Sequence, residues 1–210
     1  MKDRRVSEAV IRRLPKYYRQ LEWLSANDVE RISSSALAEQ MNLNASQVRQ
    51  DLNCFGGFGQ QGYGYHVKNL HKEIAAILGL DRTHKIIIAG AGNIGQALCN
   101  YEGFAQEGFS VCALFDVDEA LIGQEISGRP IYHIDQMEDF IREHNIEIGV
   151  ISARRRAAQS IADAMVSAGI KGIWNFVPTT VTAPVPVENV HLSDSMYVLA
   201  YRINSLEHDC

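Results

Sequence analysis

A glycine-rich turn directly after a run of β-branched residues constrains the fold of this chain more than any other feature. Residues 85–89 predict a strand that is buried on both faces, as in a parallel sheet. The turn follows this strand and opens a segment with helical periodicity, which is how a dinucleotide-binding fold begins. We therefore expect the turn to hold a pyrophosphate through Gly90, Ala91, Gly92, Asn93, Ile94 and Gly95.

An acidic residue stands where the same fold requires one. Asp116 follows the last glycine of the turn by 21 residues, at the end of the next predicted strand. A carboxylate there accepts hydrogen bonds from the adenosine ribose. A 2′-phosphate about 4 Å away would cost on the order of 4 kcal/mol per pair of unit charges at an effective dielectric constant of ~20. Asp116 therefore favours NAD(H) over NADP(H).

A run of three arginines, residues 154–156, bears on this preference because it follows the strand predicted at 147–151. If these side chains faced the adenosine, they would offset the cost of a 2′-phosphate. A charge run at the start of a helix is more often a solvated surface. Both interpretations stay open on the sequence alone.

In the rest of the C-terminal part, segments with strand-like patterns alternate with segments that have helical periodicity. Further strands are predicted at 110–115, 130–133 and 172–176, and helices at 94–103, 136–143 and 155–168. This alternation predicts βαβ units and a doubly wound, largely parallel sheet of the α/β class.

No catalytic or metal site is predicted. After the last predicted strand only 34 residues remain, which is too few for a substrate domain, and no paired carboxylates or Cys/His arrangement stand at a strand end. The four cysteines lack the C-x-x-C spacing of a zinc site or a disulfide framework. Two alternatives remain open: a small NAD-dependent oxidoreductase with a helical appendage, and a CoA-binding module.

The location of the protein is expected to be cytoplasmic. Its longest apolar run, residues 86–91, has about six residues, whereas a membrane-spanning helix needs roughly 20. The N-terminus is charged and lacks the apolar core of a signal peptide. Scattered cysteines are expected to stay reduced in that compartment.

The N-terminal part has a different periodicity, with three predicted helices. Residues 7–24 form an amphipathic helix that Pro15 kinks or splits, and a second helix follows residues 33–35. A third begins after Asn44, which can cap it, with Gln47 at the reciprocal capping-box position. This third helix buries Val48 and Leu52.

A glycine-rich ribbon completes this part. Five of the 16 glycines lie between residues 56 and 64, interleaved with aromatic residues, which favours a short hairpin or wing. Three helices and a wing are typical of a winged helix-turn-helix, whose third helix enters the major groove of DNA. A three-helix packing module without nucleic acid remains the alternative.

Charge agrees with a polyanion partner for the front of the chain. Residues 1–80 carry a net charge of +3, whereas residues 81–210 carry −8. Arg49 can reach guanine or phosphate, glutamines can pair with adenine, and the basic residues of the first helix add affinity that salt weakens. The expected DNA-binding residues are Arg12, Arg13, Lys16, Asn44, Ser46, Gln47, Arg49, Gln50, Gly62, Gly64 and Tyr65.

The last segment predicts a helix from about Ser193, with Met196, Leu199, Ala200 and Ile203 on one side. It lies outside any βαβ unit, so this apolar stripe needs a second surface, and an exchanged terminal helix is a low-cost route to a dimer. The expected organisation is a winged-helix domain at 1–80, a Rossmann domain at 81–190 and a swapped helix and tail at 191–210.

With these residues in view, the chain resembles the Rex family of redox-sensing transcriptional repressors over nearly its whole length. The resemblance implies a homodimer that binds a palindromic operator and releases it when NADH binds between the cores. It also implies that Tyr101 lies near the nicotinamide and that Arg19 and His191 take part in the switch. It is carried by residues 13–19, 47–52, 55–56, 62–65, 90–95, 101–104, 115–118, 168–173 and 175–178.

Five positions depart from the pattern that the resemblance implies. Gln50 stands where a lysine is common, and Gln60 and Gln61 stand where basic residues are usual, which predicts fewer phosphate contacts and a weaker salt dependence. His191 replaces an acidic residue of the switch, and Arg154 replaces a proline beside the cofactor strand.

Overall fold

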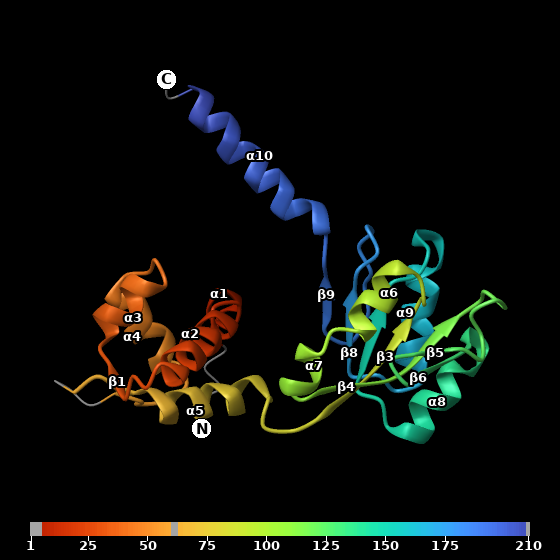
Figure 1. The fold of residues 1–210 in the computed structure, drawn as a ribbon, viewed down its shortest axis with the longest axis horizontal. Helices are drawn as coiled ribbons and strands as arrows, with labels where there is room; N and C mark the ends of the chain where they lie inside the picture. The colour runs from red at the N-terminus through yellow and green to blue at the C-terminus, as the bar shows by residue number, and fades with distance from the viewer. Residues whose placement is uncertain (1–5, 60–62, 209–210) are drawn as a thin grey trace. The chain divides into compact units, whose positions relative to one another are not determined.

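The chain divides into two compact units, Met1–Arg82 and Thr83–Cys210, in a computed structural model (Figure 1). The structure describes residues 6–59 and 63–208. Among these, no helix is long and apolar enough to cross a membrane.

The N-terminal unit consists of helices around a small apolar core. The amphipathic segment is split, because Pro15 lies in the first turn of the second helix, where its missing N–H costs nothing. Tyr17 and Leu21 from that helix pack against Val48, Leu70 and Ile74. The elements in order are α1 (Glu8–Ile11), α2 (Leu14–Ala26), β1 (Arg31–Ile32), α3 (Ser34–Gln40), α4 (Ala45–Asn53), β2 (Tyr65–His66) and α5 (Val67–Leu78).

The two short strands pair differently from the hairpin that we expected within the glycine-rich ribbon. Among the described residues of this ribbon, only Tyr65 is in a strand, and β2 pairs antiparallel with β1, which precedes α3. Gly64 makes this possible: its φ is +69°, and a Cβ there would lie 2.5 Å from the carbonyl oxygen of Ile32. Gln60, Gln61 and Gly62 lie outside the described residues.

The C-terminal unit contains a seven-stranded sheet in the order β5-β6-β4-β3-β7-β8-β9. Every neighbouring pair is parallel except β5 and β6, so the predicted α/β class is confirmed. From β6 to β9 the order is that of two mononucleotide-binding halves, with its reversal between β3 and β7. The strands are β3 (His84–Ala89), β4 (Phe109–Asp116), β5 (Glu125–Ile126), β6 (Arg129–His133), β7 (Ile148–Ile151), β8 (Gly172–Asn175) and β9 (Val187–Asn189).

Helices cover both faces of this sheet (Figure 1). Ile87 and Ala89 of β3 pack with α8 (Met137–His144) and α9 (Ala158–Ser167), whereas Ile86 and Ile88 pack with α6 (Asn93–Cys99). The helix predicted at 94–103 is wrong in extent, because α6 ends at Cys99 and α7 (Gly103–Gln106) is separate. Short 3-10 turns, Ile134–Gln136 and Arg155–Ala157, precede α8 and α9.

The last helix, α10 (Leu192–His208), begins one residue before the predicted start. Its predicted stripe is exposed, with Met196 at 62%, Leu199 at 49% and Ile203 at 51%. An exposed apolar face of this size needs another surface to cover it.

Candidate functional site

The glycine turn after β3 is held close to the loop after β7. Gly90 has a φ of +108°, and a Cβ there would lie 2.6 Å from the carbonyl carbon of Ser152. The hydroxyl of Ser152 donates to the carbonyl oxygen of Gly90 at 2.9 Å. Gly95 is buried directly beneath this carbonyl, so no larger residue fits there. The turn is therefore a fixed backbone cradle with its outer side free.

Asp116, at the end of β4, binds the same turn. Its Oδ2 accepts the backbone N–H of Ala91 at 2.6 Å, and its Oδ1 accepts the N–H groups of Val117 at 2.7 Å and Asp118 at 3.1 Å. A carboxylate has about four lone-pair positions, so these three bonds leave room for roughly one more. The predicted ribose acceptor thus also holds the glycine turn in place, a duty that the sequence analysis missed.

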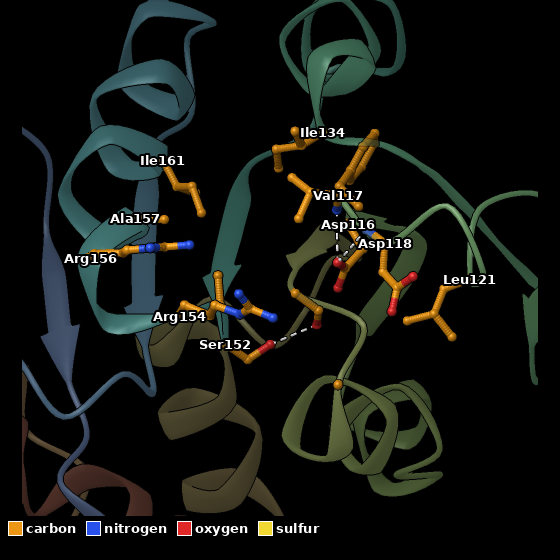
Figure 2. Close-up of a pocket in the computed structure, with 14 residues that line it drawn as sticks. Asp116, Val117, Asp118, Leu121, Ile134, Ser152, Arg154, Arg156, Ala157 and Ile161 are labelled. Carbon is orange, nitrogen blue, oxygen red and sulfur yellow. Dashed lines mark hydrogen bonds between the residues drawn. The ribbon is translucent and has the colours of Figure 1, made fainter.

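A cavity of about 680 Å³ opens between the turn and the end of β7 (Figure 2). Gly90, Gly92 and Asp116 line it, as expected for a site at the point where the strand order reverses. All three arginines of the run are exposed, as expected for a solvated face, and the side chains of Arg154 and Arg156 also line the cavity. The remaining lining residues are Phe115, Val117, Asp118, Leu121, Ile134, Ser152, Ala153, Ala157 and Ile161.

Not every predicted cofactor residue lies at this cavity. Asn93 and Ile94 begin α6 and are exposed, and Ala91 contributes its N–H to Asp116. Tyr101 is 57% exposed and packs edge-on against Phe104, with ring centroids 4.9 Å apart. Its ring lies over Gly103, where a Cβ would be 2.6 Å from it.

A buried carboxylate fixes the predicted recognition helix α4 to α2. Asp51 is fully buried and accepts two hydrogen bonds from the guanidinium of Arg13, at 2.6 and 2.8 Å. The hydroxyl of Tyr17 donates to it at 2.9 Å, and the amide of Gln47 donates at 2.7 Å. Every acceptor position of Asp51 is therefore used inside the unit.

This cluster shifts the proton affinities of its members. Burial alone would raise the pKa of Asp51, but hydrogen bonds from Arg13, Gln47 and Tyr17 and the charge of Arg13 outweigh it and hold that pKa below its ordinary value. Burial, with the hydrogen bond to Asp51, raises the pKa of Tyr17. The ion pair is therefore charged, and the phenol neutral, across the neutral range.

Two predicted DNA contacts are engaged in this cluster. Arg13 binds Asp51 through both arms of its guanidinium, and the side chain of Gln47 bonds to Asp51 rather than to the backbone N–H of Asn44. Only half of the expected capping box forms: the amide oxygen of Asn44 accepts the N–H of Gln47 at 2.7 Å. These residues position α4, which the sequence analysis did not foresee.

Arg49 lies on the exposed side of α4 beside two hydroxyls. Its guanidinium donates to Ser34 at 3.0 Å and to Ser46 at 3.2 Å. Gln50 is exposed next to it. Guanidinium, hydroxyl and amide groups on one exposed helix surface are the groups that bind phosphates and base edges.

The other predicted contacts differ in exposure. Lys16 and Arg19 are exposed on α2, whereas Arg12 follows the last residue of α1 and pairs with Glu8 at 3.0 Å. The basic residues expected on one first helix therefore belong to two helical segments. Tyr65 is 6% exposed and belongs to the core of the unit, because a ring of this size fills the space between the ribbon and the helices.

Among the described residues, no group of three or more His, Cys, Asp or Glu side chains could hold a metal ion. The described cysteines, Cys54, Cys99 and Cys112, are free. His191 lies before α10, where its carbonyl accepts the N–H of Asp194 at 3.0 Å.

Two family models match the chain, one in each unit. Residues 5–53 match a model described as "Putative DNA-binding protein N-terminus". Residues 81–179 match one described as "CoA binding domain", a Rossmann-like domain.

Curated relatives cover both units at once. The redox-sensing transcriptional repressor Rex of Clostridium beijerinckii is 52% identical over 208 residues, which are 98% of this chain and 99% of that protein. The protein of the same name from Thermoanaerobacter pseudethanolicus is 51% identical over 98% of this chain and 93% of that protein.

Solved structures match along the same length. RSP in complex with beta-NAD+ and operator DNA has a TM-score of 0.92 and 51% identity, covering 96% of this chain and 94% of that one. RSP in complex with beta-NADH has a TM-score of 0.90 and 48% identity, covering 97% and 96%.

Proposed function

Because the chain belongs to the Rex family of redox-sensing transcriptional repressors, we propose that it binds operator DNA when NADH is scarce and releases this DNA when NADH binds. One observation carries the proposal. A single chain combines the cavity at Gly90, Gly92 and Asp116 with an exposed recognition surface at Arg49, and relatives of half-identical sequence match both parts. One of the matching structures holds beta-NAD+ and operator DNA, and another holds beta-NADH.

In this proposal NADH acts as a ligand and is not consumed. It binds two arrangements of the protein with different affinities, and the arrangement with the higher NADH affinity has the lower DNA affinity. To move such an equilibrium from 1:99 to 99:1, NADH must prefer the released arrangement by about 10⁴-fold in total. Gly90 to Gly95 bind the pyrophosphate, Asp116 binds the adenosine ribose, and Tyr101 lies near the nicotinamide.

On the DNA side, α4 enters the major groove. Bases and phosphates are faced by Arg49, Ser46 and Gln50, and the sugar-phosphate backbone of the DNA is contacted by Lys16 and Asn44. Arg12 and the backbone of Gly62 and Gly64 add phosphate contacts that salt weakens. Arg13, Gln47 and Tyr65 support this surface from within the unit, since their side chains are engaged or buried there.

We further infer a homodimer that binds a palindromic operator in the bacterial cytoplasm. The exposed apolar stripe of α10 supports the dimer, because a second copy offers the surface that this stripe needs. A twofold dimer reads two half-sites related by the same symmetry. Arg19 and His191 are the residues that link cofactor binding to the DNA-binding units.

Two rival functions make different predictions. The relatives are repressors rather than enzymes, so steady oxidation of NADH with a carbonyl substrate is not expected. The match of residues 81–179 to a CoA-binding model keeps CoA as a competitor for the cavity. Displacement of NADH by CoA at equal concentration would favour that alternative.

The proposal is tested on a DNA duplex that the full-length protein itself selects from random sequence. Fluorescence anisotropy follows the bound fraction while NADH and NAD+ are titrated separately. We expect a palindromic duplex to be selected, NADH to release it, and NAD+ to leave it bound. Failure to select any sequence, or equal release by both dinucleotides, contradicts the proposal.

A further inference from the structure

Two arginines face two aspartates across the cavity. Figure 2 shows the side chains of Arg154 and Arg156 extending into the cavity from the side opposite Asp116 and Asp118. Arg154 precedes the 3-10 turn after β7, and Arg156 lies within it. The cavity therefore has one acidic wall, at the end of β4, and one basic wall.

The basic wall is not neutralised by the protein. In the part of the chain that the structure describes, neither Arg154 nor Arg156 has an ion pair or a side-chain hydrogen bond. By contrast, Arg142 on α8 pairs with Glu138 at 2.8 Å and with Asp139 at 3.1 Å. Two unpaired guanidinium groups that line one cavity are suited to an anionic ligand group, because each offers a planar fork of donors that matches phosphate.

The acidic wall repels such a group less than its formal charge suggests. Three backbone N–H groups, from Ala91, Val117 and Asp118, point at the carboxylate of Asp116. Their partial positive charges offset part of the field that a nearby phosphate would meet. Asp118 is exposed to solvent, which screens its charge, and Arg154 and Arg156 are exposed and screened as well.

We propose that Arg154 and Arg156 bind the 2′-phosphate of NADP(H), so that this chain binds NADPH nearly as well as NADH. The inference rests on the proposed function, since it takes the cavity to be the adenosine end of the dinucleotide site. A repressor built in this way responds to the reduced state of both nicotinamide pools.

The test compares the dissociation constants of NADH and NADPH for the full-length protein, measured by quenching of intrinsic fluorescence. For the wild type we expect NADPH to bind less than about tenfold more weakly than NADH. The double variant Arg154→Ala with Arg156→Ala should widen this ratio by about tenfold or more, the size of a lost charge-assisted hydrogen bond, with little change for NADH. Arg155→Ala removes an equal charge outside the cavity lining and should leave the ratio unchanged.

Several outcomes overturn the inference. A wild type that does not bind NADPH, or a ratio that the double variant leaves unchanged, does so directly. An equal loss of both affinities would show that the arginines hold the adenine or the pyrophosphate instead. If NADH binds the wild type and releases DNA, but the ratio of the NADPH and NADH dissociation constants is the same in the double variant, this inference fails and the proposed function stands. If NADH itself does not bind, both fail.

A folding defect in the double variant does not block the test. The single variants Arg154→Ala and Arg156→Ala each remove one cation, and each should raise the ratio about threefold or more. Thermal unfolding of each variant checks that the fold is retained. Single variants that fold and leave the ratio at its wild-type value contradict the inference.

Discussion

Two carboxylates, Asp51 and Asp116, organise the two units by binding groups of their own chain. Asp51 joins α4 to α2 through Arg13 and Tyr17, and Asp116 joins β4 to the glycine turn through Ala91. Asp51 is fully buried and its hydrogen bonds are complete, whereas Asp116 is half-buried and faces a cavity. Asp51 therefore forms a structural ion pair, whereas Asp116 has about one acceptor position left for a hydrogen bond from a ligand.

Replacing Asp51 should destabilise the N-terminal unit in a pH-dependent way. Asp51→Asn leaves Arg13 without its buried partner, which typically costs about 3 kcal/mol or more. Because the folded-state pKa of Asp51 is lowered, its contribution is present above the unfolded-state pKa of about 3.9 and is lost as the pH falls through the folded-state value.

Urea unfolding of the wild type and Asp51→Asn at pH 7 and near pH 3 measures this contribution. We expect a large difference in midpoint at pH 7 that shrinks near pH 3. Exposed Asp28→Asn, in the same unit, serves as the control. An equal difference at both pH values would mean that the stabilisation does not come from the ionised carboxylate.

Replacing Asp116 should weaken NADH binding without affecting DNA binding. Asp116→Ala frees the N–H of Ala91 and removes the ribose acceptor, so we expect the dissociation constant of NADH to rise at least about tenfold. Asp118→Ala is the matched control, because this side chain lines the same cavity but accepts only the N–H of Ala120. Isothermal titration calorimetry measures both, and equal losses in the two variants would argue against the assigned role of Asp116.

At the scale of elements, periodic segments were predictable and short or sterically forced ones were not. The β-branched run at 85–89 identifies β3, and Asn44 identifies the start of α4. The strands β5 and β9 have two and three residues, too few to show a period, and the sequence analysis missed both. The pairing of β2 with β1 depends on the close approach of Gly64 to Ile32, which no local pattern reports.

Within the candidate site, spacing could have revealed one missed residue. Asp51 lies three residues after Val48 and next to Leu52, on the buried side of α4, and a buried carboxylate requires a partner. That Arg13 is this partner depends on how α2 packs against α4. The same limit applies to Arg154 and Arg156, whose direction into the cavity is set by the turn after β7.

At the scale of elements, we predict that the recognition helix α4 provides a specific contact to the operator. Arg49→Ala removes an exposed guanidinium that the core does not use, so we expect operator binding to fall by about tenfold or more while NADH binding is retained. Lys72→Ala, an exposed cation on α5, is the matched loss of charge and should weaken DNA binding far less. A gel-shift titration decides, and similar losses in the two variants would mean that α4 contributes only charge.

At the scale of the whole molecule, the exposed apolar side chains of α10 need a second protein surface to pack against. The helix has 17 residues, and its apolar side chains are exposed. Left in water, these side chains would contribute no free energy of burial to the stability of the protein. We expect the double variant Leu199→Glu with Ile203→Glu to shift the protein from dimer to monomer. Asn204→Glu, adjacent to the stripe, should leave the dimer intact.

Sedimentation equilibrium at several protein concentrations gives the mass directly. A wild type that sediments as a monomer at micromolar concentration contradicts the proposed dimer. A double variant that still sediments as a dimer would move the interface away from α10.

We expect the two arrangements of the proposed dimer, one bound to DNA and one bound to NADH, to differ in the separation of the two DNA-binding units. This expectation is tested most directly by measuring the distance between spin labels attached through Glu73→Cys, an exposed position on α5, with the native cysteines replaced by serine. We expect one distance distribution for the protein on its operator and a clearly different one after saturation with NADH, with NAD+ leaving the first unchanged. Identical distributions on operator and with NADH would contradict it.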